Sequence, residues 1–264
     1  MSSRSPLLVV STGCGLVAQA AEAGGADFVA AYSSGRARMR GLGSLAAMLP
    51  FERANEVVFE LVREIVAAVS GVPVLAAVCA TDPRTTPDAL VHELARSGAA
   101  GVQNFPSIGL VDGVFRSHLE ETGFGFEAEV ELMDAARRAG LLACPFVFDE
   151  PTAQAMARAR PTMACVHLGV TGGRGDTSAL STLDEAIVRT QMVVAAIDGS
   201  FADRPSVLVH GGSVRTARDL AVLLQAVPEV SGFVAGSSIE RDAIASAVAA
   251  ETGRFKSILR GRAC

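Results

Sequence analysis

The sequence predicts an α/β protein, a single (β/α)8 TIM barrel over residues 1–264. Short apolar runs alternate with helix-like segments eight times, which is typical of a parallel sheet closed into a barrel. The chain length of 264 residues suits one such barrel, and no Pro/Ser-rich linker divides the sequence. A doubly wound open sheet is the alternative fold.

Eight runs rich in β-branched and small apolar residues are the predicted strands. They cover residues 7–13, 28–34, 73–82, 101–107, 142–149, 163–170, 206–212 and 232–238. The clearest helix between them is ERANEVVFELVREIVAAVSG (52–71), whose apolar residues share one helical face and which ends at glycine. PDALVHELARSG (87–98) opens with Pro and closes with Gly. FEAEVELMDAARRAG (126–140) places acids early and arginines late, which suits the helix dipole.

Composition excludes several classes of protein. The net charge is −5 and no run of like charges occurs, so we expect no nucleic-acid partner. No apolar run approaches the roughly 20 residues of a membrane span, and the N-terminal apolar stretch is too short for a signal peptide. Five cysteines, an odd number without a CxxC pair, indicate a reducing, cytoplasmic setting.

Polar residues stand at the ends of several predicted strands. They are Ser11, Ser34, Asp82, Asn104, Asp149, His167 and His210. In a barrel the carboxyl ends of the strands meet at one face, the barrel mouth, where the reactive groups of such enzymes gather. We therefore expect the functional site there, with Ser34 and Asn104 orienting a substrate.

Glycines follow the last two predicted strands. Gly211 and Gly212 end the seventh run, and Gly236, Ser237 and Ser238 end the eighth. Barrels often bind phosphate in these two loops, where bare amides can approach an anion. The sequence predicts an anion site here, for a phosphate or a carboxylate. The simpler interpretation is that the glycines only turn the chain.

Two histidines, His167 and His210, end consecutive predicted strands. Imidazoles titrate near neutrality, so the pair can serve as acid and base. With Asp82 they can instead hold a divalent metal such as Mg²⁺, although no metal-ligand spacing is present. A structural, hydrogen-bonded role for each is the simpler alternative.

The longest connection, residues 108–131, follows the fourth predicted strand. Long loops in compact domains are usually functional or disordered, and this one keeps several apolar residues. It predicts a lid that brings Glu121 over the mouth as a catalytic group. A solvated cap with ordinary surface charges is the alternative.

Arg36 and Arg38 follow the second predicted strand and can clamp a carboxylate, unless the loop is simply exposed. Ser11 and Cys14 lie in STGCG, but no GxSxG pattern marks a nucleophile. Lys256 is the single lysine of the chain and lies in the last helix, so Schiff-base chemistry at the mouth is excluded.

Several stretches together resemble the phosphoenolpyruvate hydrolase-like family, also described as predicted TIM-barrel signal-transduction proteins. They are EAGGADFVAAYSSGRARMRGLGSLAAMLPF, VCATDP, GVQNFPSIGLVDGVFRSHLEETGFGFEAEVE, VHLG, VHGG and GSSIER. The resemblance runs over nearly the whole chain. It implies a (β/α)8 barrel related to enzymes that act on phosphonopyruvate and similar keto acids.

Two functions follow as expectations. The first is a hydrolase, or a carbon–carbon or carbon–phosphorus lyase, acting on a small anionic keto-acid-like substrate. Asp82, Glu121, His167 and His210 would be its catalytic groups, and Arg36 would help to bind the substrate. The second is a non-catalytic small-anion sensor or protein-interaction module on the same barrel. In either case the chain is expected to be a homo-oligomer.

Overall fold

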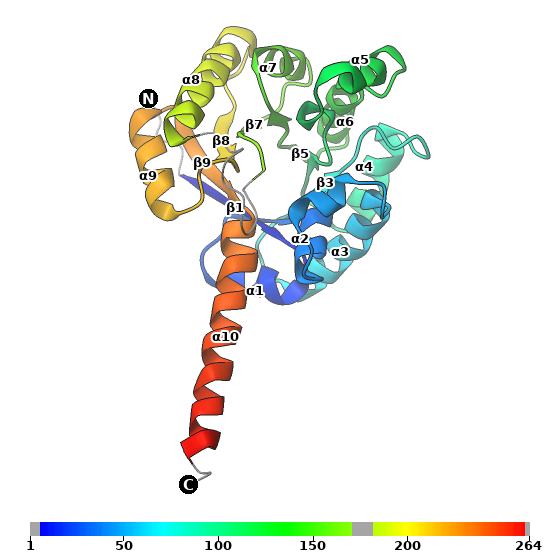
Figure 1. Cartoon of the computed structure of the whole chain (residues 1–264). Helices are drawn as coiled ribbons and strands as arrows, with labels where there is room; N and C mark the ends of the chain where they lie inside the picture. The colour runs from blue at the N-terminus through cyan, green and yellow to red at the C-terminus, as the bar shows by residue number, and fades with distance from the viewer. Residues whose placement is uncertain (1–5, 171–181, 262–264) are drawn as a thin grey trace.

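The computed structural model describes residues 6–170 and 182–261 and shows a parallel sheet curled into a barrel, with helices around it (Figure 1). The strands are β1 (Leu7–Thr12), β2 (Phe28–Ala31), β3 (Val74–Val78), β4 (Gly101–Asn104), β5 (Leu142–Ala143), β6 (Phe146–Val147), β7 (Met163–His167), β8 (Ser206–His210) and β9 (Val230–Ala235). Their order in the sheet is β5-β4-β3-β2-β1-β9-β8-β7-β6. The predicted α/β TIM-barrel-like fold is confirmed.

The fifth predicted strand is split into β5 and β6 by Cys144 and Pro145. Proline has no N–H and cannot continue a ladder of hydrogen bonds, which accounts for the break. β5 pairs with β4 and β6 pairs with β7, so the two edges of the sheet lie only two residues apart along the chain. Eight predicted runs therefore appear as nine strands in the described part of the chain.

The side chain of Asn104 closes the sheet at this break. Its Oδ1 accepts a hydrogen bond from the Phe146 N–H at 2.6 Å, and its Nδ2 donates to the Phe146 carbonyl at 3.2 Å. One side-chain amide thus replaces the backbone pairing that β4 would otherwise make at this point. We call this junction, Asn104 with residues 144–146, the seam.

Helices follow the strands and cover the barrel. They are α1 (Gly15–Ala23), α2 (Ser33–Met39), α3 (Ala54–Ala68), α4 (Pro87–Arg96), α5 (Gly113–Glu121), α6 (Glu127–Arg138), α7 (Glu150–Ala157), α8 (Leu183–Ser200), α9 (Ala217–Ala226) and α10 (Ser237–Gly261), with 3₁₀ turns η1 (Ser44–Met48) and η2 (Ile108–Leu110). The three helices predicted above appear as α3, α4 and α6. Among the described helices, none combines the length and the apolar character needed to cross a bilayer.

The helix α10 leaves the barrel and extends away from it as a single rod of 25 residues (Figure 1). Val248, Phe255, Ile258 and Leu259 fall on one face of this rod and are 60–65% exposed. We call these four side chains the α10 stripe. Only the first turns of the helix are held by the rest of the chain.

Two local predictions need correction. The second predicted strand, 28–34, ends at Ala31, so Ser34 lies in the first turn of α2 rather than on a strand. The long connection contains η2 and α5 before it enters α6. The helix α5 has no buried residue and ends at Glu121, which is exposed.

Candidate functional site

A small cavity opens at the carboxyl ends of the strands. We call it the mouth cavity. It is lined by Ser11, Tyr32, Ser34, Arg38, Ser44, Phe105, His167, Val170, His210, Gly236 and Ser237. Its volume is about 30 Å³, which is room for about two water molecules.

His167 and His210 line this cavity together. They pair in register as the last residues of β7 and β8, so their side chains leave the sheet on the same side. Their ring centroids are 4.9 Å apart, with the planes at 65°. The structure thus brings together the two histidines that the sequence placed at consecutive strand ends.

The hydrogen bonds of the two rings differ in direction. Nδ1 of His167 accepts from the Gly169 N–H at 3.1 Å, so the neutral ring carries its proton on Nε2. Nδ1 of His210 lies 2.7 Å from the Val234 carbonyl, which can only accept, so this ring carries its proton on Nδ1. One ring therefore offers a donor at Nε2 and the other an acceptor.

Aromatic side chains pack against both histidines. Phe146 lies 4.9 Å from the ring of His167 and 5.4 Å from that of His210, centroid to centroid. Burial, with His210 and Arg189 nearby, lowers the pKa of His167 well below its ordinary value. Burial, with Arg38 nearby, lowers the pKa of His210 to about 4. At neutral pH both rings are therefore uncharged, and each presents one N–H and one bare ring nitrogen.

Arg38 supplies the positive charge of the mouth cavity. Its Nη2 donates to Ser11 Oγ at 2.8 Å, and its Nη1 donates to Ser44 Oγ at 3.0 Å. Its Nε lies 2.6 Å and its Nη2 2.5 Å from Glu240 Oε2. Glu240 belongs to α10, is fully buried, and accepts through Oε1 from the Gly13 N–H at 2.5 Å. Burial raises the pKa of Glu240, and Arg38 opposes this shift.

The structure separates Arg36 from Arg38. The two residues lie two positions apart on α2, so they point to different sides of the helix. Arg36 pairs with Glu64 at 2.5 Å and does not line the mouth cavity, whereas Arg38 does. Of the two arginines, Arg38 is thus the one placed beside the cavity.

Asp82 and Glu121, predicted to be catalytic, do not line the mouth cavity. Asp82 accepts from Arg84 Nε and Nη2, each at 2.8 Å. Its hydrogen bonds with the Arg84 side chain, the strongest influence on this carboxyl, lower the pKa of Asp82. Glu121 lies at the exposed end of α5, a helix without a buried residue.

Asn104 is buried at the seam, where its side chain hydrogen-bonds the Phe146 backbone and the Glu129 carboxylate. Glu129, on α6, is fully buried and also accepts from Ser107 Oγ and the Ile108 N–H, each at 2.7 Å. Burial raises the pKa of Glu129 to about 7, against these hydrogen bonds. No pattern in the sequence marks this carboxyl, because its position within an amphipathic helix resembles that of any surface glutamate.

The glycines after β8 shape the turn. Gly211 and Gly212 have φ values of 77° and 58°, a region that glycine adopts freely. A Cβ on Gly212 would lie 2.7 Å from the Leu168 carbonyl oxygen, and the Gly212 N–H already donates to Gly169. Neither glycine lines the mouth cavity.

The glycine and serines after β9 stand closer to the predicted site. Gly236 and Ser237 line the mouth cavity at the start of α10, whereas Ser238 does not. A Cβ on Gly236 would lie 3.4 Å from His210 Cε1, so this position keeps the space beside the imidazole open. The N-terminal end of α10, with its positive dipole, thus faces the same cavity as Arg38.

The described residues do not fit a Mg²⁺ site. No group of three or more His, Cys, Asp or Glu side chains in residues 6–170 and 182–261 converges as a metal site would. Magnesium prefers carboxylate and water oxygens, but Glu240 is held by Arg38 and Asp82 by Arg84.

Comparison with known proteins places the chain among relatives of greater length. It is 42% identical over 260 residues to the ToMV resistance protein Tm-1(GCR237) of Solanum lycopersicum. The match covers 98% of this chain but 34% of that protein, so the chain spans about a third of the tomato protein's length.

Solved structures share the fold at low identity. One is phosphonopyruvate hydrolase in complex with oxalate and Mg²⁺, with a TM-score of 0.60, 17% identity, and coverage of 98% of this chain and 84% of that one. Another is oxaloacetate acetylhydrolase in complex with the product oxalate, with a TM-score of 0.61, 14% identity, and coverage of 96% and 82%. The sequence profile of one family, phosphoenolpyruvate hydrolase-like, matches residues 1–258. The chain belongs to the phosphoenolpyruvate hydrolase-like family.

Proposed function

We propose that the chain hydrolyses or cleaves a small anionic keto-acid-like substrate at the mouth cavity. The observation that carries this proposal is the neutral pair of His167 and His210, with opposite proton positions, beside the buried guanidinium of Arg38. Acid–base catalysis needs one group that can donate and one that can accept at the working pH. This pair offers both within one cavity.

Each group has a role in the proposal. In hydrolysis, Nε2 of His210 takes a proton from the attacking water as the water oxygen bonds to the substrate, and the imidazolium returns that proton to the leaving group as the scissile bond breaks. The Nε2–H of His167 donates a hydrogen bond to the oxygen that gains negative charge. Arg38 holds the carboxylate, and Ser34, Gly236 and Ser237 line its surroundings. Lys256 lies on the exposed outer part of α10, so the reaction proceeds without an imine.

A keto-acid substrate needs more space than the mouth cavity offers. The mouth cavity has a volume of about 30 Å³, less than a keto acid requires. Arg38 is also already paired with Glu240. A substrate carboxylate would therefore replace the Glu240 carboxylate on Arg38, and the start of α10 would shift as it enters.

A test combines turnover with binding. The full chain is incubated with phosphonopyruvate, oxaloacetate or phosphoenolpyruvate, and products are followed by NMR, while oxalate binding is measured by calorimetry. His210→Gln should reduce turnover by about a hundredfold or more with oxalate binding retained, whereas the exposed His92→Gln should change neither. Unchanged turnover in the His210 variant, or absence of both turnover and oxalate binding in the natural chain, contradicts the proposal.

A second candidate is a small-anion sensor that binds without turnover. The observation in its favour is that Glu240, in the first turn of α10, occupies Arg38 as an incoming carboxylate would. Displacement of Glu240 would weaken the attachment of α10 to the barrel. A partner protein that contacts α10 would then respond to anion binding in the mouth cavity. Oxalate binding without turnover of any of the three acids, together with faster hydrogen exchange in residues 237–244, would favour this candidate over the enzyme.

A further inference from the structure

A cavity larger than the mouth cavity lies at the opposite end of the barrel from it. Its volume is about 500 Å³, within the range of small-molecule sites. Four of its lining residues, Phe28, Leu142, Met163 and Ser206, are the first residues of β2, β5, β7 and β8. We call it the floor pocket. Its other lining residues are Arg137, Ala157, Arg160, Pro161, Thr162, Phe201, Ala202, Asp203 and Arg204.

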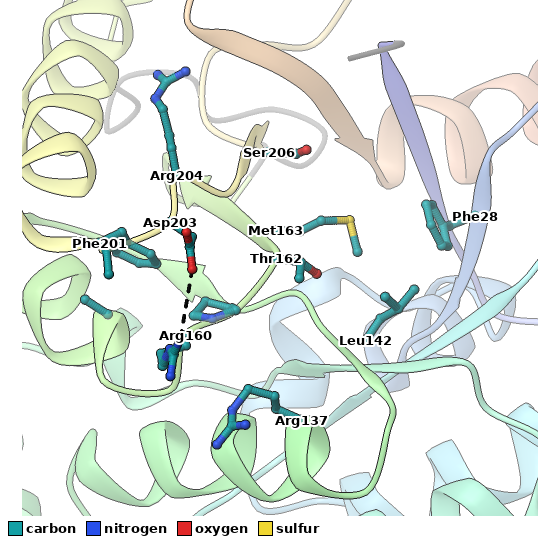
Figure 2. Close-up of a pocket in the computed structure, with 13 residues that line it drawn as sticks. Phe28, Arg137, Leu142, Arg160, Thr162, Met163, Phe201, Asp203, Arg204 and Ser206 are labelled. Carbon is teal, nitrogen blue, oxygen red and sulfur yellow. Dashed lines mark ion pairs between the residues drawn. The ribbon is translucent and has the colours of Figure 1, made fainter. Parts of the chain in front are cut away.

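Apolar side chains form the inner wall of the floor pocket. In Figure 2, Phe28 and Phe201 stand on opposite sides, with Met163 and Leu142 between them. Met163 is buried, and the other three are half-buried. Large apolar groups that remain partly exposed around one concave surface are suited to an apolar ligand body.

The rim of the floor pocket is cationic. Arg137, Arg160 and Arg204 line it together with Asp203. Arg137 also pairs with Asp134 at 2.7 Å and Arg204 with Asp198 at 2.5 Å, in exposed ion pairs that are individually weak. Arg160 Nη2 lies 3.9 Å from Asp203 Oδ2, and both side chains are largely exposed, so this ion pair is weak (Figure 2). Arg204 points away from the pocket in Figure 2, which leaves Arg137 and Arg160 beside it.

The backbone of Arg160 adopts a conformation that favours glycine. Its φ is 52°, and no other non-glycine residue among those described has a positive φ. Glycine adopts this conformation freely, whereas a side chain makes it unfavourable. Arg137 lies in the last turn of α6, where a cation also suits the helix dipole. Arg160 lies beyond the end of α7, in a conformation that favours glycine, and places a guanidinium at the pocket rim.

We propose that the floor pocket binds an organic anion with an apolar body, such as a medium-chain carboxylate. The apolar wall would hold the body, and Arg160 and Arg137 would hold the carboxylate. This site is separate from the mouth cavity, since the two lie at opposite ends of the strands.

Calorimetry with octanoate as the probe tests this assignment on the full chain. Octanol, which lacks the charge, and acetate, which lacks the chain, should each bind at least about tenfold more weakly, because each lacks one of the two contacts. Saturating oxalate should leave octanoate binding unchanged if the two sites are separate.

Variants separate this role from a structural one. Arg160→Gly should weaken octanoate binding about fivefold or more, yet leave the melting temperature unchanged or raised, because glycine suits the positive φ. Ala202→Trp should block the pocket. Arg158→Ala is the matched control, since Arg158 pairs with Glu127 and does not line the pocket. The proposal is overturned if octanoate does not bind, or if both pocket variants bind it with the affinity of the natural chain.

Discussion

His167 and His210 are in-register neighbours that carry their protons on opposite ring nitrogens. Each proton position is set by a backbone group, the Gly169 N–H for one ring and the Val234 carbonyl for the other. The strand ends therefore fix not only where the two imidazoles lie but also which of them can donate. This arrangement has measurable consequences for stability as well as for chemistry.

Acid should destabilise the chain through His210. Its pKa in the folded state, about 4, lies below its ordinary value of 6.5, so the unfolded chain binds more protons between these pH values. Stability is thus lost as pH falls through this range. His210→Gln should lose about 2 kcal/mol less than the natural chain between pH 7 and pH 4.5, measured by urea unfolding. Equal losses in the two proteins would contradict the assignment, and the exposed His92→Gln is the control.

Glu129 should have the opposite effect on the free energy of unfolding as the pH falls from 7 to 4.5. Its folded-state pKa, about 7, lies above its ordinary value of 4.5, so here the folded chain binds more protons. Its contribution is complete below pH 4.5 and is lost as pH rises through 7. Glu129→Gln should therefore steepen the loss of stability from pH 7 to pH 4.5 by about 2 kcal/mol.

The slope is the readout for Glu129→Gln, because the new side-chain amide would meet the donor groups that now face the carboxylate and would lower stability at every pH. Glu131→Gln, on the exposed side of the same helix, should leave the slope unchanged. A Glu129 variant with the slope of the natural chain would show that this carboxyl is ionised in the folded state across the range.

Breaking the buried ion pair of Arg38 and Glu240 should lower the stability of the fold. Arg38→Met leaves a buried carboxylate without its partner and should reduce the free energy of unfolding by about 3–5 kcal/mol. The double variant Arg38→Met/Glu240→Met, which buries no charge, should recover most of this loss. Arg36→Met removes a more exposed pair and should cost under about 1 kcal/mol. A double variant no more stable than Arg38→Met would refute this account of the pair.

The α10 stripe should join two copies of the chain. The barrel also exposes Leu42, Leu45, Leu49 and Phe51, each by 50% or more, so one copy offers an apolar helix and a second an apolar surface. We expect the full chain to sediment as a dimer or larger homo-oligomer. Phe255→Ser/Leu259→Ser should shift it to monomer, while Ala250→Ser/Arg260→Ser, on other faces of α10, should not. A natural chain that sediments as a monomer contradicts this prediction.

Much of the fold could be predicted because its signals are local. The helices α3 and α4 end within three residues of Gly71 and Gly98, and the strands coincide with apolar runs, so both signals lie in neighbouring residues. The division of the fifth strand was missed, although Pro145 marks it, because the run is apolar on both sides of the proline. The end of the second strand was misplaced because Ser33 and Ser34 suit a strand end and a helix start equally.

The site could be predicted only in part. His167 and His210 come together because register between parallel neighbours follows from the strands themselves. Arg36 and Arg38 could not be told apart until the residues after β2 were known to be helical, since helical geometry sends them to different sides. Glu240 lies 202 residues from Arg38, and pairing at such a distance leaves no mark in one sequence.

The seam joins the two edges of the sheet. Cys144 and Pro145 link β5 to β6, and the Asn104 amide bonds the Phe146 backbone across the break between them. Proline removes the N–H that a regular strand would offer at this point. A side chain thus supplies at one position the continuity that backbone hydrogen bonds give to the rest of the sheet.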